Sequence, residues 1–315
     1  MSTDLKSSFV IATRNRPGDL LRTVESLVAQ TVLPDELCVV DSSDETPRRE
    51  AVEKLCADGG LALDYLHPAP RGLTVQRNVG IGRTGGDIVF LIDDDVWLEA
   101  DCHEKILEEY AKWGPEVGGV RATPVRPAKP SRATTLYRRF FGIGGWWPEA
   151  SGKIRKGFYA EGISDSAGVR KIEYMNGWFM SYRREVFEHE LFDEALAGYG
   201  YKEDIDFSYR VSRRYTLLQT PAARCDHLKS GASRMNSHEL QRMNLANQFY
   251  LHRKLMPQTF LHKAALWWAL TGLFILNLGK AVQTRDGGLV TGLVAGAFEQ
   301  ARGRGLVDPQ HEKKQ

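Results

Sequence analysis

The chain has 315 residues, of which 42% are hydrophobic and 26% charged, and its formal net charge at pH 7 is +2. This length suits one large domain or a domain with an appendage. The composition excludes the disordered and fibrous classes, and so small a net charge gives no general attraction to nucleic acid. Four cysteines without metal spacing or a dense disulfide framework fit a reducing cytosol. No signal peptide is expected before the apolar strand that begins at Phe9.

The first 125 residues alternate between strand and helix patterns. Strands are expected at 9–13, 37–40, 63–67 and 88–92, and helices at 19–30, 46–57, 73–84 and 99–113. Repeated strand–helix units predict a parallel sheet with right-handed crossovers. Ligands bind such sheets beyond the carboxyl ends of the strands. Polar residues at 13–15, 41 and 93–95 all follow strands, so we expect them to gather along one edge of the sheet.

Three adjacent aspartates, Asp93, Asp94 and Asp95, follow the apolar run at 88–92. Their carboxylates repel one another strongly in a low-dielectric setting. A bound cation would offset that repulsion, and hard divalent metals prefer carboxylate oxygens. Alternatively, the acids cap the following helix, since aspartate is a favoured N-cap residue. The three residues by themselves leave both interpretations open.

No helical or strand period holds over residues 132–165, where basic, aromatic and glycine residues are mixed. This segment is expected to be a long loop or a small excursion from the sheet. Long irregular segments of compact domains are often lids or binding loops. A surface excursion that packs its aromatic side chains on the body of the protein is the alternative.

Regular structure is expected again at 172–182, with helices at 184–190 and from Glu203 onward. Asp204 and Asp206 join Glu203 in the first turn of the latter helix, where negative charge is stabilising in any case. A short strand is expected at 217–218, and residues 225–227 are expected in the loop that follows.

The C-terminal third is more apolar. A helix is expected at 239–256, followed by apolar stretches at 264–278 and 289–298. The first stretch contains Trp267 and Trp268 but is short for a membrane span, which takes roughly 20 residues. Tryptophans with flanking lysines suit a membrane interface, so contact with a membrane surface is expected through residues 262–300. Packing of both helices on the rest of the protein is the alternative. Gly292 and Gly296 are spaced for close helix contact.

Several ordered motifs together resemble a family 2 glycosyltransferase, over about residues 8–230. They are FVIATRNRP at 9–17, VVD at 39–41, QRNVG at 76–80, IDDD at 92–95, NG at 176–177 with SYRREVF at 181–187, and YKEDIDF at 201–207. The resemblance implies an α/β GT-A fold with a Rossmann-like, mostly parallel sheet flanked by helices. It implies a catalytic domain at 1–235, with a donor-binding half at about 1–125 and an acceptor-side half at about 126–235. A C-terminal helical region, 236–315, would follow.

The same resemblance assigns the metal site. Asp95 is implied as the main ligand, Asp93 as its support, and Asp94 as a ligand of the donor ribose. His227 stands where some members supply a further metal ligand, and an imidazole favours Mn²⁺ over Mg²⁺. A surface histidine or one paired with an acid, beside Asp226, is the alternative. The expected cofactor is a divalent metal, Mn²⁺ or Mg²⁺, which bridges phosphate oxygens in such enzymes.

Donor recognition is implied for residues of the first loops. Asp41 resembles the carboxylate that accepts from the N3–H of a pyrimidine, which indicates a UDP- or dTDP-sugar. Arginine forks match phosphate geometry, so Arg77 is expected to steady the diphosphate, and Arg71 either does so or is solvated. Asn78 is expected to fix a loop through backbone hydrogen bonds. The expected donor-binding residues are Thr13, Arg14, Asn15, Asp41, Arg71, Arg77, Asn78, Asp93 and Asp94.

Asp204 resembles the general base of the family, and Glu203 either raises its proton affinity or binds the acceptor. Processive members carry a Gln-x-x-Arg-Trp motif that residues 241–245 do not complete. A non-processive, inverting transfer to a glycan or lipid-linked acceptor is therefore expected, in cell-surface polysaccharide synthesis at the inner face of the cell membrane. No nucleic-acid partner is expected. The alternatives are a non-catalytic nucleotide-sugar-binding or scaffold protein, and a sugar nucleotidyltransferase, whose glycine-rich first loop is not seen here.

Overall fold

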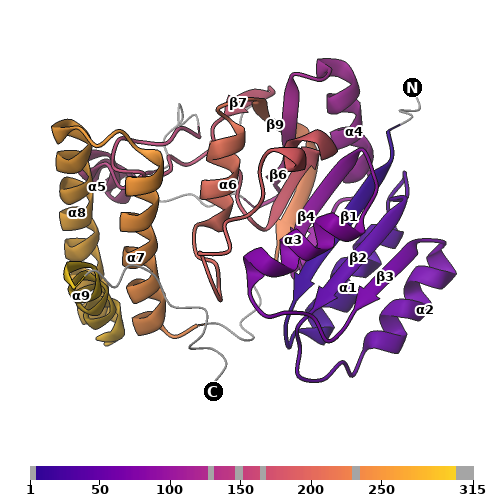
Figure 1. Ribbon diagram of the computed structural model, residues 1–315, viewed down its shortest axis with the longest axis horizontal. Helices are drawn as coiled ribbons and strands as arrows, with labels where there is room; N and C mark the ends of the chain where they lie inside the picture. Colours follow the sequence, from indigo (N-terminus) through magenta and orange to yellow (C-terminus); the bar gives the residue numbers. More distant parts are fainter. Residues whose placement is uncertain (1–4, 127–130, 146–151, 164–167, 229–234, 303–315) are drawn as a thin grey trace. The chain divides into compact units, whose positions relative to one another are not determined.

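The computed structural model describes residues 5–126, 131–145, 152–163, 168–228 and 235–302. The chain divides into two compact units (Figure 1). The first comprises Met1–Pro127, Asp165–Asp193 and Phe207–Ser233, and the second Ala128–Ser164, Glu194–Asp206 and Arg234–Gln315. These units follow a different division from the sequence domains expected at 1–235 and 236–315, which stay a prediction.

A mixed sheet forms the centre of the first unit. Its strands run in the order β3-β2-β1-β4-β8-β6-β9-β5, with β7 beside β9. Strands β1 to β4 pair in parallel, as expected, whereas β8, β5 and β7 pair antiparallel with their neighbours. The strands are β1 (Ser7–Thr13), β2 (Glu36–Asp41), β3 (Ala62–Leu66), β4 (Ile88–Asp93), β5 (Val96–Leu98), β6 (Val117–Pro124), β7 (Arg170–Ile172), β8 (Phe179–Arg183) and β9 (Thr216–His227).

Helices connect the parallel strands of this unit close to where the sequence predicts them. Pro17 opens the first, where its fixed φ suits a helix and its missing N–H costs nothing. The helices are α1 (Pro17–Val28), α2 (Arg49–Gly59), α3 (Leu73–Arg83) and α4 (Cys102–Trp113), with a 3-10 turn, η1 (Arg184–Glu188). Helix α6 (Glu203–Val211) begins at Glu203, as predicted.

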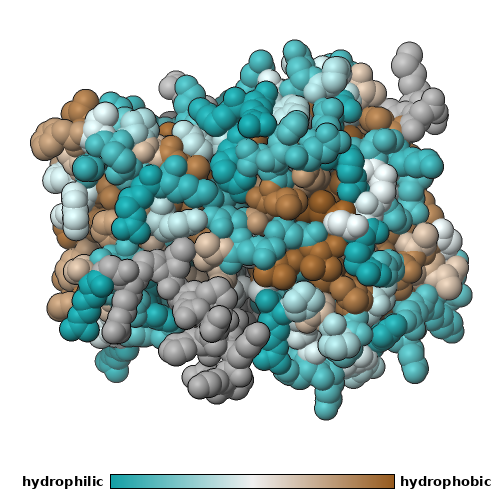
Figure 2. All heavy atoms as spheres, viewed as in Figure 1, coloured by the Kyte–Doolittle hydropathy of each residue, from teal (hydrophilic) through white to brown (hydrophobic). Residues whose placement is uncertain are grey.

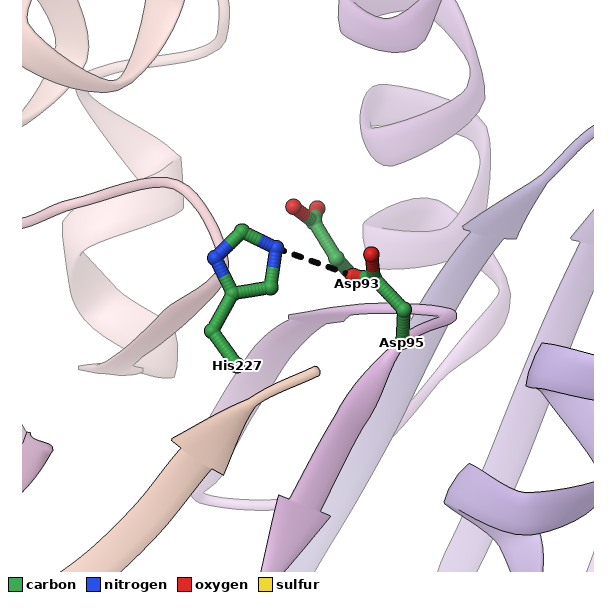
Figure 3. Close-up of side chains that lie close together, drawn as sticks. All are labelled: Asp93, Asp95 and His227. Carbon is green, nitrogen blue, oxygen red and sulfur yellow. Dashed lines mark ion pairs between the residues drawn. The ribbon is translucent and has the colours of Figure 1, made fainter. Parts of the chain in front are cut away.

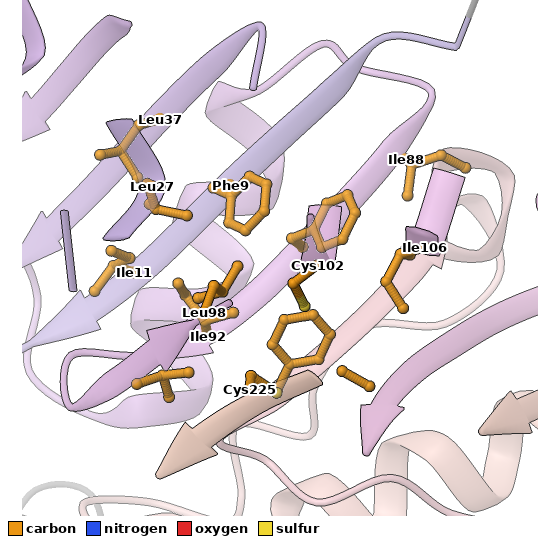
Figure 4. Packing of buried hydrophobic residues seen from close by; sticks show 14 of the residues in the cluster. Phe9, Ile11, Leu27, Leu37, Ile88, Ile92, Leu98, Cys102, Ile106 and Cys225 are labelled. Atoms are coloured by element: carbon orange, nitrogen blue, oxygen red, sulfur yellow. The ribbon is translucent and has the colours of Figure 1, made fainter. Parts of the chain in front are cut away.

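Buried hydrophobic side chains of the sheet and its helices form the core of the first unit (Figure 4). Phe9 of β1 and Phe90 of β4 stack with their centroids 4.3 Å apart, and the buried His103 of α4 meets both rings edge-on. Such pairs add to the free energy gained by burial. Because β1 and β4 are fixed in register by this packing, the residues at their carboxyl ends are fixed as well.

The second unit is helical. It contains α5 (Arg132–Phe141), α7 (Ser237–Leu255), α8 (Phe260–Thr284) and α9 (Gly288–Ala301). A Cβ at Gly292 would lie 2.2 Å from the His238 carbonyl, and one at Gly296 2.9 Å from that of Arg242. These glycines therefore allow α9 to approach α7 closely, and the predicted close helix contact is confirmed.

Three predictions about local structure are wrong. Residues 132–141 form α5 rather than a loop, because Ser131 caps the helix and Tyr137 and Phe141 pack against α8. Outward-facing apolar residues on α5 obscure its period. Residues 146–151 and 164–165 of that segment lie outside the described residues. Residues 225–227 end β9 rather than forming a loop, because they pair with β5.

The third correction concerns α8. Its 25 residues extend beyond the apolar run on both sides, and it is long and apolar enough to cross a membrane by length and composition. The expectation that this stretch is too short for a membrane span is therefore wrong as far as length and composition go. Figure 2 shows brown and pale side chains over α8 and α9, and Trp267 and Val282 are among the exposed apolar residues there.

We predict that Gly80→Ala destabilises the protein. A Cβ at Gly80 would lie 2.3 Å from Val10 Cγ1, inside the contact between α3 and β1. Overpacking of this kind lowers the free energy of unfolding by about 1–3 kcal/mol. Gly82→Ala in the same helix is the control, because its Cβ would meet nothing within 4 Å, and it should stabilise by about 0.5–1 kcal/mol. Denaturant unfolding compares the two, and equal stabilities would contradict the packing assigned to α3.

Candidate functional site

The sequence-predicted aspartates meet a histidine at one edge of the sheet (Figure 3). Each of Asp93, Asp95 and His227 offers a ligand atom, and these atoms lie within 4.8 Å of one another. Asp93 ends β4, and β5 begins just after Asp95. His227 arrives from β9, whose antiparallel register pairs it with Val96. Strand pairing therefore brings the histidine to the acids across more than 130 residues of sequence.

Asp95 is the partner of His227. Its Oδ1 lies 3.0 Å from His227 Nε2, and its side chain is almost fully buried. The imidazole stacks on Trp178, with ring centroids 5.6 Å apart and an interplanar angle of 13°. Successive strand residues point to opposite faces, and Asp226 accordingly pairs with Arg126. The described contacts thus give His227 an acidic partner at the cluster rather than at Asp226.

The donor set of this cluster fits a divalent cation. Two carboxylates and one imidazole supply oxygen and nitrogen ligands from three backbone positions. Carboxylates suit Mg²⁺ and Mn²⁺ alike, whereas the imidazole favours Mn²⁺. Asp95 is nearly buried, and an imidazole and a second carboxylate lie close to it. A cation bound there would offset the repulsion between the carboxylates of Asp93 and Asp95.

The buried residue Arg77 forms an ion pair with Asp93. Its side chain is 2% exposed, and its Nη2 donates to Asp93 Oδ1 at 3.0 Å and to the Gly177 carbonyl at 2.7 Å. The guanidinium also lies over the Phe192 ring, 5.3 Å from its centroid. In the described structure Arg77 therefore orients a candidate metal ligand. Its expected contact with a diphosphate stays a prediction.

Asp94 ties the first loop to the end of β4. Its Oδ2 accepts from Thr13 Oγ1 at 2.7 Å, and its Oδ1 accepts from Arg16 Nη1 at 3.1 Å. Burial raises the pKa of Asp94 to about 7, although the hydrogen bond from Thr13 and the charge of Arg16 both lower it. Asp94 thus differs from its two neighbours in environment, and its expected contact with a donor ribose stays a prediction.

A small cleft opens beside Asp41 at the ends of β1 and β2. Thr13, Ser43 and Tyr65 are among its lining residues. Tyr65 Oη donates to Asp41 Oδ2 at 2.5 Å, and the Ser43 N–H donates to Asp41 Oδ1 at 2.8 Å. Both oxygens of this buried carboxylate are therefore held in place beside the cleft.

Residues of the first loop gather around Asp44. Asn15 has a left-handed backbone, with φ of 56°, and exchanges two hydrogen bonds with Asp44. Arg71 forms an ion pair with the same carboxylate at 2.6 Å, and Arg14 is exposed nearby, close enough for its charge to act on Asp44. The structure therefore places Arg14, Asn15 and Arg71 together.

Asn78 fixes a loop, as predicted. Its amide donates to the Phe192 carbonyl and accepts from the Phe192 N–H, both at 3.0 Å. This pairing joins α3 to the segment that follows η1, and the predicted backbone hydrogen bonds are confirmed.

The expected base, Asp204, belongs to the second unit together with Glu203. Asp204 Oδ1 accepts from the Ile205 N–H at 2.8 Å, and Glu203 is buried. Asp206, also buried, pairs with Lys254 of α7 at 2.8 Å. Burial lowers the pKa of the neighbouring Lys202 to about 7, although the Asp204 charge raises it. In this segment a lysine whose pKa is lowered, Lys202, therefore lies close to the carboxylate of Asp204.

Comparison with known proteins identifies the family. The model of Glycosyl transferase family 2 matches residues 8–190. This chain belongs to that family.

Two curated relatives illustrate the likeness in sequence. A glucosyl-dolichyl phosphate glucuronosyltransferase of Haloferax volcanii is 32% identical over 188 residues, which are 58% of this chain and 54% of that protein. Galactofuranosyltransferase GlfT1 of Mycobacterium tuberculosis is 31% identical over 153 residues, and the match covers 41% of this chain and 45% of that protein. The chain spans about half the length of the curated relatives it matches.

Two solved structures share the fold. Mannosyltransferase PcManGT of Pyrobaculum calidifontis, in complex with GDP-Man and Mn²⁺, aligns with a TM-score of 0.56 and 17% identity over 94% of this chain and 87% of that one. GalNAc-T7 with UDP, GalNAc and Mn²⁺ aligns with a TM-score of 0.56 and 16% identity, over 89% of this chain and 58% of that one. The expected α/β GT-A fold with C-terminal helices is thereby confirmed.

Sequence reasoning missed three side chains at the site of this family 2 chain. Arg16 contacts Asp94 and lies 3.7 Å from Asp95, Tyr65 holds Asp41, and Trp178 stacks on His227. Arg16 stood inside the quoted RNRP run, so a signal for it existed. The sequence contains no such signal for Tyr65 and Trp178, because each reaches the site only through strand pairing or a loop.

We predict that Arg77→Gln weakens Mn²⁺ binding in the presence of UDP by about 10–100-fold, the usual cost of losing a group that orients a metal ligand. Arg83→Gln in the same helix is the control, because Arg83 pairs with Asp64 on the exposed side, and it should bind Mn²⁺ as the wild type does. Isothermal titration measures both, and equal affinities for all three proteins would remove the role given to Arg77.

Proposed function

We propose that this chain is a metal-dependent, inverting, non-processive glycosyltransferase that moves one sugar from a UDP- or dTDP-sugar to an acceptor hydroxyl. The observation that carries the proposal is the cluster of Asp93, Asp95 and His227 on the same edge of the sheet as the Asp41 cleft. A cation site and a nucleobase site at one edge are what a nucleotide-diphosphate donor requires.

In this proposal Asp95, Asp93 and His227 hold the divalent metal, with Mn²⁺ preferred because of the imidazole. The bound cation supplies Lewis-acid stabilisation of the leaving diphosphate. Arg77 keeps Asp93 in position, and Arg16 with Thr13 fixes Asp94 for a contact with the ribose. PcManGT and GalNAc-T7, which share the fold, were solved with Mn²⁺, and this supports the assignment.

Asp41 is proposed to accept from the N3–H of uracil or thymine. Tyr65 and the Ser43 N–H hold its carboxylate, so it meets the base without reorganising. Thr13, Arg14 and Asn15 border the nucleoside, and Arg71 stands close to them. One structural neighbour was solved with GDP-Man and the other with UDP, so the choice of base rests on Asp41 rather than on the fold.

Asp204 is proposed to remove the proton of the acceptor hydroxyl. Attack on the face opposite the leaving group inverts the anomeric carbon, and a carboxylate within hydrogen-bond reach of the hydroxyl suffices as base. Glu203, buried beside it, raises the proton affinity of Asp204 or binds the acceptor. A glycan or lipid-linked acceptor of cell-surface polysaccharide synthesis is proposed, with action at the inner face of the cell membrane. The exposed apolar residues of α8 and α9 support that location.

We predict that Asp204→Asn lowers kcat by about 10²–10⁴-fold, the usual contribution of a general base, while leaving the affinity for the nucleotide unchanged. Glu185→Gln, at an exposed acid of η1, is the control and should turn over as the wild type does. Turnover is measured against UDP-, dTDP- and GDP-sugars, with and without Mn²⁺. Unchanged turnover of Asp204→Asn would overturn the mechanism, and preference for a GDP-sugar would overturn the role of Asp41.

A further inference from the structure

The turn of residues 176–178 contacts two of the candidate metal ligands. It leads into β8, which pairs antiparallel with β4 and places Phe179 opposite Ile92. The turn therefore lies beside Asp93, whose N–H donates to the Trp178 carbonyl at 3.1 Å. The backbone of the turn thus fixes the backbone of one candidate ligand, and this contact does not depend on the side chain at position 178.

The side chain of Trp178 packs on a second candidate ligand. Its ring stacks on the His227 imidazole, with the centroids 5.6 Å apart and the planes at 13° to each other. A metal bonds to the lone pair of an imidazole nitrogen, and that lone pair lies in the plane of the ring. The last torsion of a histidine side chain is broad, so the stack restricts the plane in which Nε2 can lie. In the structure Nε2 is 3.0 Å from Asp95 Oδ1, at the cluster (Figure 3).

Trp178 is itself held in place by its neighbours in the first unit. It is half-buried and packs against the hydrophobic core. The buried Arg121 of β6 lies over its ring, with Cζ 5.7 Å from the centroid, and donates from Nη1 to Asn176 Oδ1 at 2.8 Å. A guanidinium over the face of an indole is attracted by the ring electrons. Trp178 is therefore the fixed partner of the stack, and the orientation of the imidazole depends on it.

The two kinds of ligand differ in the cations that they select. Carboxylate oxygens suit Mg²⁺ and Mn²⁺ alike, whereas an imidazole nitrogen favours Mn²⁺. The ion pair of Asp93 with Arg77 does not involve Trp178, but the orientation of His227 does. Loss of the stack should therefore weaken the binding of Mn²⁺ more than the binding of Mg²⁺.

We propose that Trp178 is a positioning residue that holds His227 toward the metal and thereby gives the site a preference for Mn²⁺ over Mg²⁺. This inference rests on the proposed function, because it concerns the metal bound at the same cluster. It goes beyond that function, since it makes the choice of metal depend on a side chain that is not a ligand.

Metal binding to the full chain in the presence of UDP tests the proposal. Electron paramagnetic resonance of free Mn²⁺ measures the affinity for Mn²⁺, and displacement of bound Mn²⁺ by Mg²⁺ measures the affinity for Mg²⁺. Trp178→Leu should weaken Mn²⁺ binding about tenfold, the lower end of the usual cost of losing a group that orients a ligand. It should change the affinity for Mg²⁺ by less than about twofold, because both carboxylates remain. Trp178→Phe keeps a stacking ring and should retain the preference for Mn²⁺.

Two comparisons separate this role from a general effect on the fold. Trp97→Leu is the matched control, because Trp97 is 41% exposed on β5 and pairs with Asp226, on the face opposite to His227. It should keep the wild-type affinity for both cations. In a His227→Ala background, Trp178→Leu should cost no further affinity for Mn²⁺, since it acts through that imidazole. Thermal unfolding establishes that each variant is folded.

The proposal is overturned if the wild type does not prefer Mn²⁺, if Trp178→Leu leaves the ratio of the two affinities unchanged, or if it costs further Mn²⁺ affinity in the His227→Ala background. Asp95→Asn separates this proposal from the proposed function. If Asp95→Asn loses Mn²⁺ binding while Trp178→Leu keeps the preference, the role of Trp178 falls and the metal site stands. If Asp95→Asn also binds Mn²⁺ as the wild type does, the metal dependence of the proposed function falls.

Discussion

Repulsion between the carboxylates at the end of β4 is the constraint on which the rest of the site depends. Two unit charges 4 Å apart repel by about 4 kcal/mol at an effective dielectric constant of 20, and the chain places three acids in succession here. Each is met by a different partner: Asp93 by Arg77, Asp94 by Thr13 and Arg16, and Asp95 by His227. These contacts leave the ligand atoms of Asp93 and Asp95 within 4.8 Å of each other, where one cation could meet both, whereas Asp94 is tied to the first loop.

The sheet brings those partners together because it contains both parallel and antiparallel strands. Parallel strands β1, β2 and β4 bring the Thr13 loop, Asp41 and the aspartates to one edge. Antiparallel pairing of β9 with β5 then brings His227 to the same edge from the far end of the unit's sequence. The second unit adds a helical surface in which α7 contacts the segment that carries Asp204, through Asn247 and Lys254. Donor chemistry and acceptor chemistry thus draw on different parts of the chain.

The sequence predicted the parallel half of the sheet well, because short apolar runs and polar strand exits are local signals. The backbone contacts of Asn78 were predicted from the family resemblance instead, since its partner Phe192 is 114 residues away in the sequence. Sequence reasoning missed the antiparallel strands β5 and β7 and the end of β9, which depend on pairing between distant residues. It also missed α5, because Leu136 and Phe140 face outward and break the apolar period. The partners of Asp41 and His227 could not be predicted, since Tyr65 and Trp178 reach the site only in three dimensions.

Mn²⁺ binding in the presence of UDP tests the central claim most directly, that Asp95 and His227 hold a metal at the end of β4. Electron paramagnetic resonance of free Mn²⁺ measures it for the wild type, Asp95→Asn and Asp226→Asn. Asp226 is the matched control because it is adjacent to His227 but faces Arg126. The account predicts that Asp95→Asn weakens Mn²⁺ binding at least tenfold, which is about 1.4 kcal/mol, and that Asp226→Asn leaves it unchanged. Wild-type affinity in Asp95→Asn would contradict it.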